Sequence, residues 1–527
     1  MNPSPLITHF ARFLGGTKEQ ATLAAALAVQ ATQAGHVCAD LDCAAGWGPW
    51  AETLDADQRT AFREQLPKMT IVGGADDWTP LVWDGQRLYL RRYWDYERRI
   101  AEDLLARIAT PGALDLQVES RLAERFADAG QRNAARIALG HRLALISGGP
   151  GTGKTHTLAR IIGLLQEQHP SLRIALAAPT GKAAARMTEA LQVAGVATEG
   201  GAQTLHRLLG MRADGSGFRH RREHPLAYDV LVVDEASMID LSLMAHLLDA
   251  LPVTARLILL GDRDQLAAVE AGAVFADLCD SPRLDACVAL LTTSFRFGDD
   301  SGIGQLADCL RSGDAEGVVA QLQAGGSDLV WQSEAGIHGA IGAARAGYRA
   351  YLESVASAAS PDELFERFNR FRVLCAHRQD VATINRALAT GSGLRPTAGM
   401  PLLVLRNDSL LRVFNGDIGL VLPDPADGQL KCCFPGEPPR WIPLTRLPDW
   451  EPAWVMTVHK SQGSEFAQVL LVLPSAVSPV AMRELVYTGV TRAKQGVALW
   501  AGEAVLRAAI ERRAERMSGL RERLRQQ

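Results

Sequence analysis

The stretch Leu143-Ala-Leu-Ile-Ser-Gly-Gly-Pro-Gly-Thr-Gly-Lys-Thr155 decides the fold, because an apolar run leads directly into the complete pattern Gly-x-x-x-x-Gly-Lys-Thr. Apolar residues at helical spacing follow, from Leu158 to Leu165. A strand, a glycine-rich loop and a helix in this order direct backbone N–H groups and the positive end of the helix at an anion. The sequence therefore predicts that ATP binds here, with Lys154 at its β- and γ-phosphates and Thr155 on Mg²⁺. The expected nucleotide contacts in this loop are Gly148, Gly149, Pro150, Gly151, Thr152, Gly153, Lys154, Thr155 and His156.

Composition bounds the class of protein. With 527 residues, 47% of them hydrophobic and 22% charged, the chain is long enough for roughly three or four globular domains. Its 55 basic and 59 acidic side chains give a net charge of −4, so any nucleic-acid contact is confined to a local channel. The apolar run Thr22–Val29 is too short to span a bilayer. We therefore expect a soluble cytoplasmic protein with no membrane contact.

The eight cysteines are scattered, with no Cys-x-x-Cys pair and no cysteine–histidine set at zinc-finger spacing. Cys38 and Cys43, which stand close together in the sequence, are by themselves a weak metal signal. Buried or bystander thiols in a reducing cytosol are therefore expected, rather than zinc or an iron–sulfur cluster.

Nearly continuous apolar runs alternate with helical patterns, which is typical of parallel sheets covered on both faces. The sequence predicts an α/β fold of two tandem units, preceded by a mainly helical N-terminal region and carrying a small β insertion. The expected strands are Leu143–Ile146, Ile174–Ala178, Val230–Val233 and Leu257–Leu260, then Val373–Cys375, Val469–Leu473 and Val497–Trp500, after a helical stretch at about 337–371. The expected domains are 1–112 (N-terminal, partner-binding), 113–335 (first α/β unit) and 336–527 (second unit), with the insertion at about 395–450.

Three segments leave alternatives open. The aromatic and charged stretch Leu88–Arg99 suits base stacking or a partner surface as well as a local core. The basic stretch Met211–Pro225 suits a DNA or partner surface, or a solvated loop. After Trp500, a charged tail with Leu506, Ala509 and Ile510 on one face favours a solvated amphipathic helix.

Further polar groups follow the expected strands of the first unit. Asp234 and Glu235 come directly after Val230–Val233, at the strand end where ligands bind in doubly wound sheets. We expect Asp234 to hold Mg²⁺ and Glu235 to polarise the attacking water. Gln265 is placed to sense the γ-phosphate or to orient water, and Gln131 to bind an adenine edge.

Two arginines are candidates for stabilising the phosphoryl group during transfer. Arg296 lies in Thr293-Ser-Phe-Arg-Phe297, and Arg492 lies in Val486-Tyr-Thr-Gly-Val-Thr-Arg-Ala-Lys494. Such a guanidinium contributes about 10³–10⁵ in rate, whereas a surface ion pair contributes only about 0–1 kcal/mol. Because Arg492 belongs to the second unit, it can complete the site only when the two units close.

Taken together, these segments resemble the superfamily 1 DNA helicases. The resemblance implies that both α/β units are RecA-like P-loop NTPase domains and that the activity is ATP-dependent DNA unwinding. The segments that carry it, in the order expected for the family, are Gly148–Thr155, Ala177–Arg186, Thr204–Gly210, Val230–Ser237, Gly261–Leu266, Thr457–Phe466 and Val486–Lys494.

Within that superfamily, finer details resemble the RecD family, the α subunits of RecBCD-type helicase–nucleases (exodeoxyribonuclease V). This resemblance implies a 5′-to-3′ translocase on single-stranded DNA at duplex ends, in a heterotrimer with RecB-like and RecC-like subunits that repairs double-strand breaks by homologous recombination. The details are Gly35–Cys38, Glu270–Val274, Arg406–Ser409, Phe414–Gly419 and Arg483–Tyr487.

Likeness to the helicases also implies which side chains face the DNA, although each of them could instead brace its loop. The segment that follows Lys494 is too short for a nuclease domain, so DNA cleavage is expected on another subunit. The alternatives are a stand-alone superfamily 1 helicase and a scaffold subunit with a degenerate site. The residues that argue against the scaffold are the intact Lys154, Asp234, Glu235 and Arg492. The expected DNA contacts are Thr180, Lys182, Thr204, His206, Thr457, His459 and Lys460.

Overall fold

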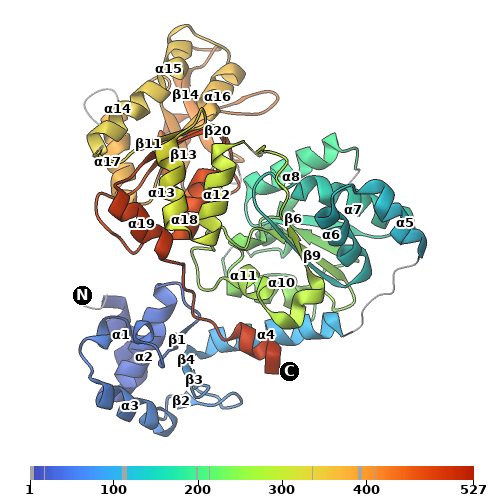
Figure 1. The fold of residues 1–527 in the computed structure, drawn as a ribbon, viewed down its shortest axis with the longest axis vertical. Helices are drawn as coiled ribbons and strands as arrows, with labels where there is room; N and C mark the ends of the chain where they lie inside the picture. Colours follow the sequence, from blue (N-terminus) through green and yellow to red (C-terminus); the bar gives the residue numbers. More distant parts are fainter. Residues whose placement is uncertain are drawn as a thin grey trace.

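A computed structural model describes residues 5–16, 18–109, 116–196, 200–212, 214–298, 300–334, 336–389, 395–408 and 410–526. Four β-sheets organise the described chain: an N-terminal sheet, two parallel sheets and an antiparallel one (Figure 1). Ser409, the last residue of the segment Arg406–Ser409, lies outside these ranges.

The N-terminal unit combines helices with a small sheet of order β1-β4-β3-β2. The mainly helical region expected from the sequence is confirmed, and the small sheet that it also carries was not expected because its strands are too short to give an alternating pattern. Its elements are α1 (Pro5–Gly15), α2 (Glu19–Gln33), β1 (Cys38–Asp40), η1 (Ala44–Ala51), α3 (Ala56–Gln65), η2 (Leu66–Lys68), β2 (Val72–Gly73), β3 (Leu81–Trp83), β4 (Arg87–Leu90) and α4 (Arg91–Ile108).

The first α/β unit is built on a parallel sheet of order β10-β5-β9-β8-β6-β7. All four strands expected here are confirmed, and their apolar residues are buried on both faces. The elements are α5 (Leu116–Arg125), α6 (Ala129–Gly140), β5 (Leu143–Gly148), α7 (Lys154–Gln168), β6 (Ile174–Ala178), α8 (Gly181–Val193), β7 (Gln203–Thr204), α9 (Leu205–Leu208), β8 (Val230–Val233), η3 (Ala236–Met238), α10 (Leu241–Ala250), β9 (Arg256–Gly261), α11 (Val274–Cys279), η4 (Pro282–Cys287) and β10 (Val288–Leu291).

The second α/β unit is built on a parallel sheet of order β11-β20-β19-β12-β18. Its three expected strands and the helical stretch before them are confirmed. The elements are α12 (Gly302–Ser312), α13 (Ala315–Ala324), β11 (Leu329–Gln332), α14 (Ile337–Gly347), α15 (Arg349–Ala356), α16 (Pro361–Arg370), β12 (Phe371–Cys375), α17 (Arg378–Leu388), β18 (Val455–Thr457), η6 (His459–Ser461), β19 (Phe466–Val472), α18 (Arg483–Thr491), β20 (Ala493–Trp500) and α19 (Glu503–Glu511).

The β insertion is an antiparallel sheet of order β16-β15-β14-β13-β17 within the second unit. The two pieces expected from the sequence, Gly419–Leu422 and Leu430–Phe434, form its strands β14 and β15. The elements are β13 (Pro401–Val404), β14 (Ile418–Pro423), β15 (Leu430–Phe434), β16 (Arg440–Pro443), η5 (Leu444–Arg446) and β17 (Trp450–Pro452).

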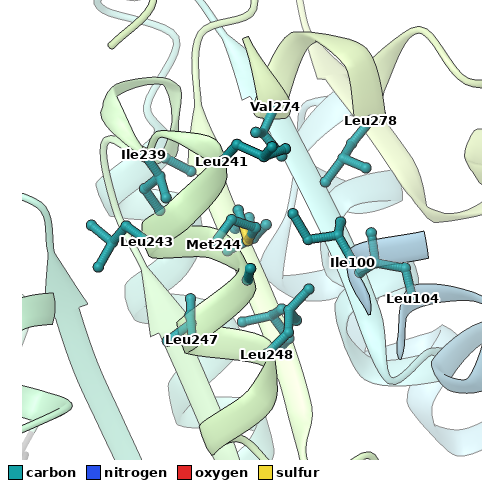
Figure 2. Packing of buried hydrophobic residues seen from close by; sticks show 14 of the residues in the cluster. Ile100, Leu104, Ile239, Leu241, Leu243, Met244, Leu247, Leu248, Val274 and Leu278 are labelled. Atoms are coloured by element: carbon teal, nitrogen blue, oxygen red, sulfur yellow. The ribbon is translucent and has the colours of Figure 1, made fainter. Parts of the chain in front are cut away.

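The packing of the units differs from the expected residue ranges at two places. Strand β11 pairs with β20, and α12 packs against α18, so residues 302–332 lie with the second sheet and not with the first. Helix α4 shares the core of the first unit, where Ile100 and Leu104 face α10 and α11 (Figure 2). In both cases the packing depends on contacts between distant parts of the chain.

The aromatic stretch Leu88–Arg99 forms the end of β4 and the start of α4. Tyr89 is fully buried, and Trp94 and Tyr96 are 6% and 9% exposed. These rings therefore belong to the local core, and the alternative of a base-stacking surface does not hold for them.

The amphipathic helix expected after Trp500 is α19, which buries Leu506, Ala509 and Ile510, but the charged residues beyond it are not one continuous solvated helix. Residues 512–526, which we call the C-terminal strap, leave the second unit and end in α20 (Leu520–Gln526), which packs on α4 (Figure 1). Leu520 and Leu524 are fully buried there, and Arg523 forms an ion pair of 3.1 Å with the buried Glu97. The charged sequence of the strap thus also contains an apolar face, which packs on α4 in the N-terminal part of the chain.

None of the helices in the described part of the chain is long and apolar enough to cross a membrane. All eight cysteines are free thiols, and burial raises the pKa of Cys279 and of Cys432 to about 12. No cluster of metal-binding side chains occurs among the residues that the structure describes.

Candidate active site

The glycine-rich loop joins β5 to α7. Gly151 and Gly153 have φ angles of 85° and 77°, a left-handed conformation that glycine adopts without strain. The Lys154 ammonium donates hydrogen bonds to the carbonyls of Gly148 (2.6 Å) and Gly149 (3.2 Å). Lys154 therefore points back over the loop, with Thr155 beside it at the start of α7.

The loop is also closely covered by its neighbours. A Cβ atom on Gly151 would lie 2.4 Å from Cβ of Arg296, and one on Gly149 would lie 2.9 Å from the hydroxyl of Tyr487. Tyr487 belongs to α18, so the second unit reaches the phosphate-binding loop. Larger residues at either glycine would displace these side chains.

Two carboxylates follow β8. Burial and the charge of Glu235 raise the pKa of Asp234 to about 6, against the opposing charge of Lys154. Glu235 has a φ of 53°, which is strained for a residue other than glycine and is a feature common at functional sites. Its N–H donates to Oδ1 of Asp234 (2.8 Å), which holds the pair together.

Gln265 lies after β9 at the junction of the two units. Its amide donates to Oδ2 of Asp262 (3.1 Å), and the same oxygen accepts a hydrogen bond from Tyr487 (3.1 Å). The carbonyl of Gln265 accepts from Nη2 of Arg492 (2.8 Å). Arg492 is 3% exposed and also donates to the carbonyl of Ser464 (3.2 Å). One network thus joins the first sheet to the second.

Arg296 meets a carboxylate that the sequence analysis did not single out as a functional residue. Glu465 forms ion pairs with Arg296, with Arg186 (2.7 Å) and with Lys494 (3.1 Å). Burial alone would raise the pKa of Glu465, but these three cations outweigh it and hold that pKa well below its usual range. Arg186 and Glu465 both lie inside the segments that carry the helicase resemblance, which was the available signal for them.

These groups surround one pocket of about 370 Å³ between the two units. The first unit contributes the loop, the carboxylates, Gln265 and Arg296, and the second contributes Gly463, Glu465 and Arg492. The predicted residues that line it are Pro150, Gly151, Gly153, Lys154, Thr155, His156, Asp234, Glu235, Gln265, Arg296 and Arg492.

Of the other predicted nucleotide contacts, Gly149 and Thr152 line an adjoining hollow, of about 310 Å³, next to Tyr487. Gln131 is 5% exposed and donates from its amide to the carbonyl of Thr152 (3.3 Å). Its amide N–H is thus directed at the loop backbone. Gly148 ends β5, where its missing side chain leaves room for Thr152.

The residues predicted to contact DNA fall into three groups: two helix-capping threonines, then Lys182 and His206, and finally residues around η6. Thr180 and Thr204 cap helices α8 and α9, each accepting a backbone N–H at 3.2 Å and 3.3 Å. Part of the Lys182 residue reaches the surface, but many protein atoms surround its ammonium group. This loss of solvation, together with the nearby charges of Arg372 and Arg186, lowers the pKa of Lys182 to about 8. His206, on α9, packs near the ring of Phe218 at 6.0 Å.

The third group lies around η6 in the second unit. Thr457 is 7% exposed, and its hydroxyl accepts the N–H of Lys460 (3.4 Å). The Lys460 ammonium donates to Glu451 (2.6 Å), and burial lowers the pKa of His459. Thr457 and Lys460 line a hollow of about 410 Å³ that also holds Arg378.

Three family models match the chain. An AAA domain model matches residues 131–271, and a UvrD-like helicase C-terminal domain model matches residues 452–500. A model of the N-terminal domain of the RecBCD enzyme subunit RecD matches residues 4–89. Together they reach the N-terminal unit and both α/β units.

Similar proteins extend the match over almost the whole chain. The RecBCD enzyme subunit RecD of Mycolicibacterium smegmatis is 42% identical, over 95% of this chain and 93% of its own. That of Haemophilus influenzae is 34% identical, over 84% and 80%. A crystal structure of Bacteroides Pif1 bound to ssDNA aligns with a TM-score of 0.42 and 17% identity, over 71% of this chain and 92% of that one. Because the identity to these RecD subunits covers four-fifths or more of both chains, this chain belongs to the RecD family of RecBCD enzyme subunits.

Proposed function

We propose that this chain is the ATP-driven DNA helicase subunit of a RecBCD-type complex. Its partners are RecB-like and RecC-like subunits, and the complex unwinds and degrades DNA ends in the repair of double-strand breaks. The polarity that we propose, 5′ to 3′, rests on the family resemblance. One observation supports the motor role above the others: Arg492 of the second unit bonds to Gln265 of the first, beside the phosphate-binding loop.

The residues of the pocket fit ATP with Mg²⁺. The loop backbone and Lys154 would hold the phosphates, and the Thr155 hydroxyl and Asp234 would hold the metal ion. The raised pKa of Asp234 next to Glu235 supports this fit, because two adjacent carboxylates are stabilised by a cation between or beside them. Mg²⁺, when bound, would neutralise charge on the transferring phosphoryl group.

In hydrolysis, Glu235 would accept a proton from the attacking water, and Gln265 would orient that water or sense the γ-phosphate. Arg492 and Arg296 would stabilise the charge of the transition state, worth about 10³–10⁵ in rate. Arg492 can do so only while α18 lies against the first unit. Hydrolysis would then release that contact, so that each turnover changes the cleft that holds DNA.

Single-stranded DNA would cross the junction of the two units, near Lys182 and Lys460. Thr180 and Thr204 already cap helices, which supports bracing as at least part of their role. We assign partner binding first to the N-terminal unit, and DNA cleavage to another subunit. The described part of the chain after Lys494 forms the rest of β20, then α19 and the C-terminal strap.

Co-purification followed by an unwinding assay tests this proposal. The chain is expected to assemble with co-expressed RecB-like and RecC-like subunits and to unwind duplexes that carry a 5′ single-stranded tail. Mutation of Lys154 to Gln in this chain should abolish the contribution from 5′-tailed ends. A chain that is processive alone and binds neither subunit would instead be a stand-alone helicase.

A further inference from the structure

A hollow of about 820 Å³ lies at the N-terminal ends of the strands of the first sheet, on the side opposite the nucleotide pocket. Arg142 precedes β5, Arg173 precedes β6, and Arg256 opens β9, so these residues stand where the strands begin. The phosphate-binding loop stands where β5 ends. The length of these strands separates the two sites by about 17 Å.

We call this hollow the arginine groove, because four arginines line it: Arg121, Arg142, Arg173 and Arg256. Asp229 is the one carboxylate among the lining residues, and it is already paired with Arg173 at 3.2 Å. The side chains of the other three arginines form no hydrogen bond or ion pair with any part of the chain that the structure describes. The groove therefore carries positive charge that no described part of the chain neutralises.

Arg256 gives the clearest sign that a partner group is missing. Its Nη1 atom is buried and has no hydrogen-bond partner. Burial lowers the pKa of Arg256, which shows that its charge is held in a poorly solvated place. Buried polar groups are normally satisfied, and an unpaired guanidinium is costly, so a ligand with acceptor oxygens would stabilise this site.

Apolar side chains form the floor of the groove, including Leu139, Leu165 and Leu226. One wall is held rigidly, because the fully buried Arg107 of α4 donates to the carbonyls of Leu251 (2.8 Å) and Ala255 (2.7 Å). The groove thus adjoins α4, the helix that joins the N-terminal unit to the first α/β unit. Its surface is therefore both charged and apolar, and it is preformed.

We infer that the arginine groove docks a segment of a partner subunit that carries carboxylate side chains beside an apolar one. Guanidinium groups match carboxylates in planar, bidentate geometry, and the leucine floor takes the apolar side chain. Charged pairs with an apolar centre are typical of protein interfaces. This inference rests on the proposed function, since that proposal supplies the partner subunits.

A nucleic acid is the less suitable occupant. The candidate DNA contacts of the first unit, Thr180 and Thr204, lie at the ends of β6 and β7, at the opposite edge of the sheet. Phosphate backbones bind to polar, solvated surfaces, whereas this groove has a leucine floor. A strand bound in the cleft between the units would not pass through it.

The double variant Arg142→Glu/Arg256→Glu tests the inference in co-expression with the RecB-like and RecC-like subunits. It should weaken assembly at least about tenfold, because charge reversal opposes acidic side chains across the interface. The matched control is Arg349→Glu/Arg446→Glu, which reverses two exposed arginines of the second unit that lie outside the groove and should assemble normally. Thermal melting and nucleotide binding should be the same for both.

The single variant Arg121→Glu provides a second test, because this residue is exposed on α5 and its change should not disturb folding. It should weaken assembly in the same direction. Assembly equal to that of the control, or loss of single-stranded DNA binding with assembly intact, would overturn the inference and leave the proposed function standing. If the unaltered chain itself fails to bind the two subunits, both fail.

Discussion

At the scale of single residues, Glu235 combines a strained backbone with a place beside the phosphate-binding loop. Changing Glu235 to Gln should reduce the rate of ATP hydrolysis by about 10²–10⁴, since a positioned proton acceptor contributes that much. Nucleotide affinity should stay within a few-fold, because Lys154 and the loop are unchanged. Steady-state hydrolysis with single-stranded DNA, paired with a nucleotide-binding titration, measures both quantities.

Glu235→Gly is the matched control for that change. It removes the side chain and also relieves the positive φ of 53°, so the melting temperature should stay equal or rise while activity is lost. Retention of full hydrolysis in either variant would remove Glu235 from the catalytic role. A fall in melting temperature in both would point instead to a structural role.

Asp277 makes stability depend on pH. Burial raises the pKa of Asp277 to about 7, although the Arg521 guanidinium acts to lower it. An acid whose folded-state pKa is raised favours folding when protonated, so its contribution is full below the unfolded pKa of about 3.9 and is lost as pH rises towards 7. The Asp277→Asn variant should therefore show a flatter change of melting temperature between pH 5 and 8 than the unaltered chain. An equally steep change in both would contradict this assignment.

At the scale of elements, the backbone conformation of the glycine-rich loop determines which of its positions must be glycine. Gly151→Ala places a Cβ atom 2.4 Å from Cβ of Arg296 on a residue with φ of 85°, so it should distort the loop and weaken nucleotide binding. Gly163→Ala is the control on α7, where a Cβ atom meets nothing within 4 Å. This control should bind nucleotide normally and gain about 1 kcal/mol of helix stability.

Nucleotide titration and thermal melting of the two alanine variants compare them directly. Equal affinity for nucleotide would show that the left-handed loop geometry is not required for binding.

The elements most readily predicted from sequence are those with strong local patterns. Strands β5, β6, β8 and β9 are continuous apolar runs, and the polar residues after them mark the ligand edge of a parallel sheet. Strand β7 and the N-terminal strands are too short to give a period. Strand β11 pairs with β20, which lies much later in the chain, and local sequence does not specify such a partner.

The candidate site divides in the same way. The motif residues Lys154, Asp234, Gln265 and Arg492 were predicted, and all four line one pocket. Asp262 and Tyr487 were not singled out for the site, although their hydrogen bond crosses from one unit to the other. Pairs this distant in the sequence depend on how the units pack, which motif spacing does not reveal.

At the scale of the whole molecule, the C-terminal strap ties the second unit to the first and to the N-terminal unit. The N–H of Met517 donates to His36, and its carbonyl accepts the N–H of Val37, in the segment Gly35–Cys38 that resembles the RecD family. Arg523 stacks on Trp94 at 3.4 Å and pairs with the buried Glu97. The strap therefore holds the N-terminal unit in place across the joint.

Changing Arg523 to Ala should destabilise this junction by about 3–5 kcal/mol, because it leaves a buried carboxylate without its counter-charge. Arg525→Ala is the control, on an exposed neighbour in the same helix. Limited proteolysis should release the N-terminal unit faster from the first variant only. Equal cleavage of both variants would show that the strap does not hold that unit.

The central claim is that ATP is hydrolysed at a joint completed by Arg492 from the second unit. The most direct test measures DNA-stimulated ATP hydrolysis and nucleotide affinity of the purified chain for Lys154→Gln and Arg492→Ala. Both variants should lose about 10³-fold or more in turnover, and Arg492→Ala should keep its nucleotide affinity while Lys154→Gln loses it. Unchanged hydrolysis in Lys154→Gln, or a loss of affinity in Arg492→Ala as large as in the lysine variant, would contradict the account.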